Sequence, residues 1–110
     1  ASRIAHHIDF PDYSEDELYS ISELMLEKMH YRLAEDAVPV FRDYIARRMV
    51  QPRFSNARSI RNALDRARLR QANRLFAARG KPFPRSALEM IEADDIRQSR
   101  VFAQLGGNTA

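Results

Sequence analysis

The sequence has no cysteine among its 110 residues. This absence excludes a disulfide framework, a zinc ribbon and a thiol nucleophile, and it gives no sign of an oxidising compartment. Long apolar runs are also missing, because the uninterrupted ones are only a few residues long and a transmembrane helix needs about 18–20. The first residues lack the charged and apolar regions of a secretory signal. We therefore expect a soluble protein of the cytosolic type with no membrane partner.

Several enzyme motifs are missing as well. The sequence has no Gly-rich phosphate loop followed by Lys-Ser or Lys-Thr, no Gly-x-Ser-x-Gly and no His-Glu-x-x-His. His6 and His7 are adjacent, so on a strand they would point to opposite faces, and no third metal ligand is near in sequence. Asp94 and Asp95 are more typical of a helix start than of an acid and base couple. These residues alone predict neither a catalytic nor a metal site.

The charge is distributed unevenly along the chain. The net charge is −6 over residues 1–41, +11 over residues 42–85 and −2 over the remainder, for a total of +3. Sixteen of the eighteen cations are arginine, whose planar guanidinium binds phosphate or carboxylate oxygens in pairs. An anionic partner is therefore worth considering for the middle of the chain.

The first part of the chain predicts one strand and one helix. Apolar and polar residues alternate over 3–10, a period of two that is typical of a strand, although no partner strand lies nearby in sequence. Ser14 and Glu17 form the Ser-x-x-Glu pattern of a capping box. A helix over about 15–30 is expected to follow, because apolar residues then recur at helical spacing.

The rest of the chain predicts further helices. We expect one over about 35–50, a long basic one over about 57–79 that ends near Gly80, a short one over 87–91 capped by Ser86 and Glu89, and a last one or two turns from 94 to about 101. The extended pieces before Asp36 and Asp94 have similar local patterns, and they predict a minimal two-stranded ribbon. The fold class is therefore a small all-α bundle of about four helices.

The long basic helix contains the richest group of polar residues. Arg58, Arg61, Asn62 and Asp65 share one face, and Asp65 is spaced to pair with Arg61. Arg58 is expected in the first turn, where free backbone N–H groups and the helix dipole favour phosphate but disfavour a cation. A solvated face steadied by local ion pairs explains the same pattern, so the residues alone leave both interpretations open.

Three stretches resemble a known family. They are similar to the C-terminal part of AAA+ ATPases. The stretches are Phe10-Pro11-Asp12-Tyr13-Ser14, Phe54-Ser55-Asn56-Ala57-Arg58-Ser59-Ile60-Arg61-Asn62 and Ile91-Glu92-Ala93-Asp94-Asp95-Ile96. The run from Asp65 to Leu75 narrows the resemblance to the CbbX family of red-type Rubisco activases. The similarity covers about residues 3–102. Sporulation and type VII secretion ATPases share two of the patterns, so a lid from one of them is an alternative.

The resemblance implies a fragment of a larger ATPase. Residues 1–10 would be the last strand of an α/β core, residues 11–102 a helical lid subdomain and residues 103–110 a disordered tail. The core, which lies outside this sequence, would supply the Walker A lysine and the Walker B acids. The isolated chain is therefore expected to hydrolyse no ATP.

The resemblance also implies roles for individual residues. Arg58 matches the sensor-2 arginine, which reaches the terminal phosphates of ATP, although Ser55 stands where many relatives have glycine. Tyr13 and Ile21 lie where lid residues approach the adenine, but a turn aromatic and an ordinary core isoleucine are equally good explanations. Arg3 resembles an arginine finger that acts on the ATP of the neighbouring subunit.

The implied function is that of an activase lid. The family forms ATP-driven hexamers with Mg bound through the core, pulls on the Rubisco large subunit to release inhibitory sugar phosphates, and responds to ribulose 1,5-bisphosphate as an allosteric ligand. The expected compartment is the cytoplasm, or the plastid stroma in a red-lineage alga.

Two alternative functions remain. One is a structural domain whose Arg58 contacts only protein. The other is a basic helical module that binds nucleic acid through Arg61, Arg66, Arg68, Arg70 and Arg74. Nucleic acid is the weaker alternative, because these arginines are spread around the helix.

Overall fold

The structure is a computed structural model that describes residues 13–78 and 81–102. Over these ranges the chain is a small helical bundle with one two-stranded sheet, which confirms the predicted fold class. The predicted strand over 3–10, Arg3, the helix terminator Gly80 and the predicted tail over 103–110 lie outside the described residues.

Helix α2 spans Glu15–Met29 and begins at the predicted capping box. The Ser14 hydroxyl accepts a hydrogen bond from the Glu17 N–H at 3.1 Å, and the Glu17 carboxylate accepts one from the Ser14 N–H at 2.8 Å. These two bonds satisfy backbone donors that the first turn would leave free. The helix ends at His30, which takes the left-handed conformation with φ 64°.

Helix α3 spans Ala37–Met49 and follows the short strand β1, Arg32–Leu33. Pro39 is the third residue of α3, inside the first turn, where backbone N–H groups have no partner within the helix. The helix therefore tolerates this proline.

Helix α4 spans Asn56–Ala77 and is the longest element. It begins one residue earlier than expected, and its N-cap Ser55 makes no capping bond with its own side chain. Instead the Ser55 N–H donates to the Ser59 hydroxyl at 2.8 Å.

The prediction of a helix over 87–91 is wrong. Residues Arg85–Glu89 form a 3₁₀ helix, η1, which begins at Pro84 without a capping side chain, and Met90–Ile91 form strand β2. Ser86 therefore does not cap a helix with Glu89. The reason is tertiary: the Gln71 side chain of α4 donates to the carbonyls of Ala87, Leu88 and Met90, and Met90–Ile91 pair with β1.

The two short strands form the predicted ribbon. They are parallel, with Arg32 opposite Met90 and Leu33 opposite Ile91, and the Ala34 N–H donates to the Ile91 carbonyl at 2.8 Å. Helix α5, Ala93–Arg97, follows directly, and residues 100–102 are again helical.

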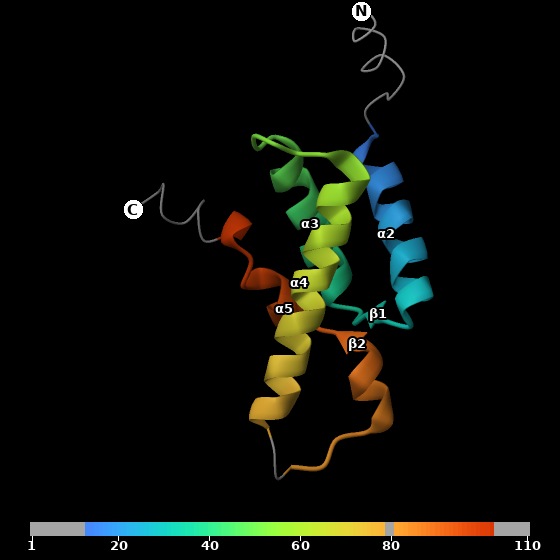
Figure 1. Cartoon of the computed structure of the whole chain (residues 1–110), viewed down its shortest axis with the longest axis vertical. Coiled ribbons are helices and arrows are strands. Elements are labelled where there is room, and N and C mark those ends of the chain that lie inside the picture. The colour runs from blue at the N-terminus through green and yellow to red at the C-terminus, as the bar shows by residue number, and fades with distance from the viewer. Residues whose placement is uncertain (1–12, 79–80, 103–110) are drawn as a thin grey trace, which may run out of the picture.

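Helix α4 organises the bundle (Figure 1). Helix α2 packs against α4 and α3, and α5 packs against both α3 and α4. The core is apolar and draws on every one of these helices. Its largest fully buried apolar side chains are those of Leu18, Phe41, Ile45, Ile60, Leu64 and Ile91. In Figure 1 the start of α2 and the start of α4 lie at the same end of the bundle.

Candidate functional site

Arg58 lies in the first turn of α4, as the sequence predicted. It is the third residue of the helix, and its side chain is exposed. Its backbone N–H donates to the Ser55 carbonyl at 3.0 Å. No carboxylate within the described residues pairs with its guanidinium. An exposed cation beside the positive end of a long helix is thus available to an external anion.

Tyr13 lies near Arg58, whereas Ile21 lies deeper. The Tyr13 N–H faces the Asn56 side-chain oxygen at 3.5 Å, which brings the start of the described chain to the start of α4. The Tyr13 side chain is 41% exposed. Ile21 is partly buried and packs against the core of the bundle. Tyr13 and Arg58 therefore occupy one end of the bundle, while Ile21 also has a structural role.

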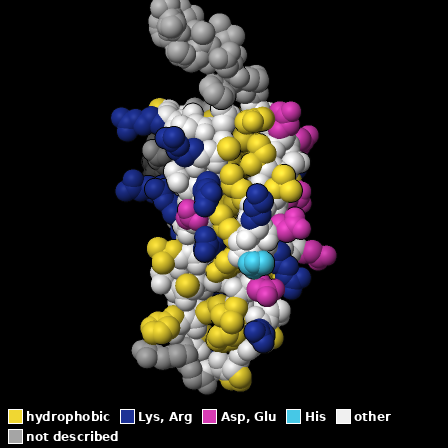
Figure 2. Space-filling view, turned by 45° about the vertical axis from the view of Figure 1, so that its right-hand side comes forward, with side chains coloured by type: hydrophobic (Ala, Val, Ile, Leu, Met, Phe, Trp, Pro, Cys, Tyr) yellow, Lys and Arg dark blue, Asp and Glu magenta, His cyan; other side chains and the backbone are white. Residues whose placement is uncertain are grey.

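Most arginines of the basic segment already have partners in the protein. Figure 2 shows Lys and Arg side chains at the upper left, in the centre and at the lower right of the view, and most Asp and Glu side chains along its right edge. Arg42 pairs with Asp16 and lies over the Tyr19 ring. The other partnered side chains are Arg47 with Asp43 and Phe102, Arg48 with the Pro52 carbonyl and Phe54, and Arg68 with Asp65 and Tyr31. Part of the positive charge of this segment thus stabilises the bundle.

The prediction that Asp65 pairs with Arg61 is wrong. Its carboxylate pairs with Arg68 at 3.1 Å, three residues further along, rather than with Arg61. Arg68 also lies over the Tyr31 ring at 5.0 Å and donates to the Met29 sulfur at 3.6 Å. These tertiary contacts fix the Arg68 guanidinium next to Asp65, and they leave Arg61 exposed.

Asp95 is the best-anchored charged residue, and the sequence indicated only its place in the first turn of a helix. Its side chain is fully buried, and its two carboxylate oxygens accept bonds from the Arg74 Nε at 3.1 Å and the Arg74 Nη2 at 2.9 Å. It also accepts from the Glu92 N–H at 2.9 Å, while Arg70 donates to its backbone carbonyl at 2.8 Å. The hydrogen bond with Asp95 raises the pKa of Arg74. This cluster holds α5 on α4.

Gln71 makes a second anchor beside it. The side chain is buried, and its Nε2 donates to the carbonyls of Ala87, Leu88 and Met90 at 3.0, 2.9 and 3.3 Å. In the sequence, Gln71 is a polar residue on the apolar face of the long predicted helix. That position is the one feature of the sequence that indicates a buried hydrogen-bonding role. Gln71 fixes η1 and β2 against α4.

The described residues contain neither a metal cluster nor a membrane helix. Across 13–78 and 81–102, no group of three or more His, Cys, Asp or Glu side chains is placed to hold a metal ion. None of the helices in these two ranges is both long and apolar enough to cross a bilayer.

Comparison with known proteins gives the affiliation of the chain. Over 102 residues it is 55% identical to the protein named Ribulose bisphosphate carboxylase/oxygenase activase, chloroplastic, of Cyanidioschyzon merolae. The alignment covers 93% of this chain and 35% of that protein. It is also 55% identical over 104 residues to Protein CbxX, chromosomal, of Cupriavidus necator, which covers 94% of this chain and 33% of the relative.

A third relative gives the same result. Over 101 residues the chain is 57% identical to Protein CbbX of Cereibacter sphaeroides, covering 92% of this chain and 33% of that protein. The chain thus spans about a third of the length of the curated relatives it matches. A family model described as an AAA lid domain matches residues 14–103, which include every element named above. The chain therefore belongs to the AAA lid domain family.

Proposed function

We propose that this chain is the helical lid subdomain of an ATP-driven AAA+ Rubisco activase that remodels red-type Rubisco and releases inhibitory sugar phosphates. The observation that carries this proposal is the 55% identity to a protein named as such an activase, over 93% of the chain. In this proposal residues 1–10 are the last strand of the ATPase core, residues 11–102 the lid and residues 103–110 a tail.

Arg58 is the sensor-2 arginine of the proposed ATPase. The support is its exposed position in the first turn of α4, with no acidic partner in the described chain. A cation at this end of a helix is unfavourable for the helix itself. Charge-assisted bonds to ATP phosphates would compensate for that cost and strengthen as the lid closes.

Three further residues have proposed roles at the nucleotide. Tyr13 and Ile21 approach the adenine, Tyr13 from the exposed end of the bundle and Ile21 from the edge of the core. Arg3 acts across the subunit boundary as an arginine finger on the neighbouring ATP. The nucleotide itself is held with Mg by the core domain.

The proposed partners follow from the parent ATPase. They are its own core domain, the neighbouring subunits of a hexamer and the Rubisco large subunit. Ribulose 1,5-bisphosphate acts as an allosteric ligand of the parent protein, and we assign it no residues. The proposed compartment is the cytoplasm, or the plastid stroma.

Steady-state ATP hydrolysis by the protein that carries this lid with its core tests the role of Arg58. We expect Arg58→Ala to lower kcat/KM for ATP by about tenfold, because a charge-assisted phosphate contact is lost. Arg61→Ala is the matched control, since Arg61 is also exposed and lies one turn further along α4. Unchanged kcat and KM in Arg58→Ala, or equal losses in both variants, would contradict the sensor role.

Two further measurements test the parent activity. Recovery of carboxylation by red-type Rubisco that carries an inhibitory sugar phosphate should require ATP and the intact protein. If no recovery occurs while ATP turnover is normal, the activase assignment fails. Mixing Arg3→Ala subunits with wild type should reduce activity beyond their fraction, whereas a strictly proportional loss would argue against action in trans.

A further inference from the structure

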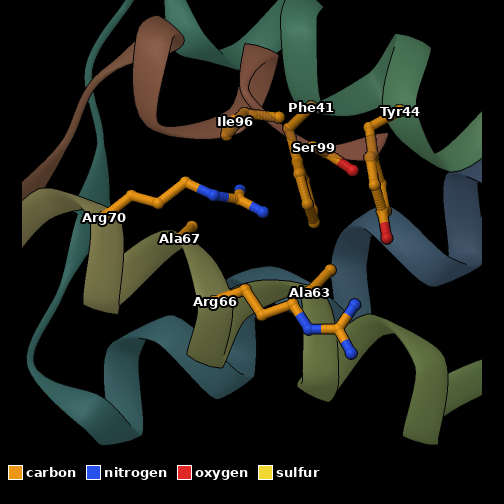
Figure 3. A pocket seen from close by; sticks show the side chains of 8 residues that line it. All are labelled: Phe41, Tyr44, Ala63, Arg66, Ala67, Arg70, Ile96 and Ser99. Atoms are coloured by element: carbon orange, nitrogen blue, oxygen red, sulfur yellow. The ribbon is translucent and has the colours of Figure 1, made fainter. Parts of the chain in front are cut away.

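A small pocket lies between α3, α4 and α5, on a part of the bundle that the proposed function does not use. Figure 3 shows the Arg66, Arg70, Tyr44 and Ser99 side chains around it, with the Phe41 ring between Arg70 and the two hydroxyl groups. Its remaining walls are apolar and come from Phe41, Ala63, Ala67 and Ile96. The accessible volume is about 10 Å³, which is close to the space that one water molecule occupies.

The pocket carries uncompensated positive charge. Arg66 and Arg70 are four residues apart on α4, a spacing at which like charges repel. No acidic side chain is among the residues that line the pocket. The nearest acid is Asp95, but Arg70 binds its backbone carbonyl and Arg74 holds its carboxylate. Burial lowers the pKa of Arg70, and the neighbouring Arg66 lowers it further, although Tyr44 and Asp95 act in the opposite direction.

Two hydroxyl groups add neutral donors to the same pocket. Tyr44 is almost fully buried, and burial raises its pKa, while nearby Arg48, Arg66 and Arg70 act in the opposite direction. The Ser99 oxygen accepts from the Val101 N–H at 3.2 Å, which leaves the hydroxyl proton of Ser99 free to donate. Cations and hydroxyl donors therefore face one cavity that has no anionic wall.

We propose that this pocket binds a tetrahedral oxyanion of the phosphate class, held by the Arg66 and Arg70 guanidinium groups and the Tyr44 and Ser99 hydroxyls. In this proposal one oxygen of the anion enters the cavity, and the other oxygens meet Arg66, which lines the pocket and is exposed. Donors from α3, α4 and the chain after α5 approach from several directions, which suits a tetrahedral anion better than a planar carboxylate.

The pocket is separate from the proposed nucleotide contact. Arg66 lies eight residues after Arg58, and the helical rise of 1.5 Å per residue places their backbones about 12 Å apart. Occupation of the pocket would join α3, α4 and the chain after α5, and so would stabilise the bundle through mass action.

An NMR titration of the chain with inorganic phosphate at constant ionic strength tests the proposal. We expect saturable shifts at the amides of Tyr44, Ala67 and Ser99, with an affinity that falls by about tenfold in Arg66→Gln because a charged donor is lost. Arg61→Gln is the matched control, since it removes the same charge from an exposed position of the same helix. The control should keep the wild-type affinity. Circular dichroism of each variant confirms that the fold is retained.

Several outcomes would overturn the proposal. Loss of binding in Arg58→Gln but not in Arg66→Gln would place the anion at the start of α4. Unsaturable shifts of equal size in all variants would indicate general screening, and an absence of shifts at tens of millimolar phosphate would leave the pocket without this ligand.

Two more ligands distinguish the source of the anion. If glycerol 3-phosphate binds more tightly than inorganic phosphate, with the same dependence on Arg66, the ligand of the pocket is an organic phosphate ester. Equal binding of the two would support free phosphate. Acetate that binds as tightly as phosphate would overturn the assignment to tetrahedral oxyanions.

Discussion

At the scale of single residues, the buried carboxylate of Asp95 holds together parts of the chain that are distant in sequence. It joins Arg74 of α4 to the Glu92 N–H at the start of α5. A buried charge is stable only while its partner and its hydrogen bonds are present. The pair thus makes the position of the C-terminal segment depend on one side chain.

We expect Asp95→Asn to lower the free energy of unfolding by about 3 kcal/mol, because the variant keeps the shape but leaves the Arg74 charge only the longer contact with the Glu92 carboxylate at 3.5 Å. Urea denaturation followed by circular dichroism measures the change. Asp94→Asn is the control: Asp94 is exposed and pairs with Arg97 at the surface, so its loss should be below about 1 kcal/mol. Equal losses of unfolding free energy in the two variants would show that the buried pair contributes no more than the surface pair.

Tyr44 gives the stability of the bundle an alkaline limit. Burial raises the pKa of its hydroxyl above the ordinary value of 10.0, so the folded protein keeps a proton that the unfolded chain releases. The contribution is fully present below pH 10 and is lost as the pH rises through the folded pKa. Tyr19 acts in the same direction, since burial raises its pKa too.

Tyr44→Phe should therefore reduce the decline of the unfolding free energy just above pH 10. The lowered pKa of Arg70 acts with the opposite sign and at higher pH, so the measurement stays close to pH 10. Urea denaturation over this range measures the slope. The exposed Tyr13→Phe variant should keep the wild-type slope, and an unchanged slope in Tyr44→Phe would contradict the argument.

At the scale of elements, α4 has different surroundings along its length. Its first turn exposes Arg58, while its second half uses Arg70, Gln71 and Arg74 to hold η1, β2 and α5. The β ribbon has only two residues in each strand, too few to be stable alone. The ribbon is held in place because the Gln71 amide donates to the Leu88 carbonyl, just before β2, and to the Met90 carbonyl, at the start of β2.

We expect Gln71→Leu to destabilise the bundle by about 2 kcal/mol, since the carbonyls of Ala87, Leu88 and Met90 would each lose the bond from the Gln71 amide. Hydrogen exchange should accelerate locally at the amides of Ala34, Ala87 and Met90, which lie in the ribbon and η1. Asn73→Leu is the control, an exposed amide on the same helix, and should change the stability by less than about 0.5 kcal/mol. Exchange that is uniform over the whole chain would argue against a local anchor.

At the scale of the whole molecule, part of the positive charge of the basic segment is engaged by groups of the protein itself. The five arginines considered for nucleic acid do not form one free surface, because Arg68, Arg70 and Arg74 bind protein groups. The net charge of the chain is only +3. Affinity for duplex DNA grows with the number of phosphates that cations can reach.

The chain should therefore show no saturable binding to nonspecific duplex DNA at low salt. Fluorescence anisotropy of a labelled duplex measures this directly. Binding that weakens steeply with salt, and that weakens further in Arg61→Gln, would contradict the expectation and favour the nucleic-acid alternative.

The sequence by itself determined the features that depend on near neighbours. The Ser14 and Glu17 capping box, the lengths of α2 and α4, the first-turn position of Arg58 and the helical fold class all arise from interactions within a few residues. Such contacts are encoded in spacing, so they can be predicted without knowledge of the packing.

The tertiary structure alone decided the rest. Ser86 and Glu89 repeat the pattern of Ser14 and Glu17, yet they do not open a helix, because Gln71 and β1 bind the backbone of that segment first. The pocket between α3, α4 and α5 and the burial of Asp95 likewise join residues that are far apart in the chain. Spacing cannot reveal which distant donor reaches a carbonyl or a carboxylate, since the packing of the helices fixes that choice.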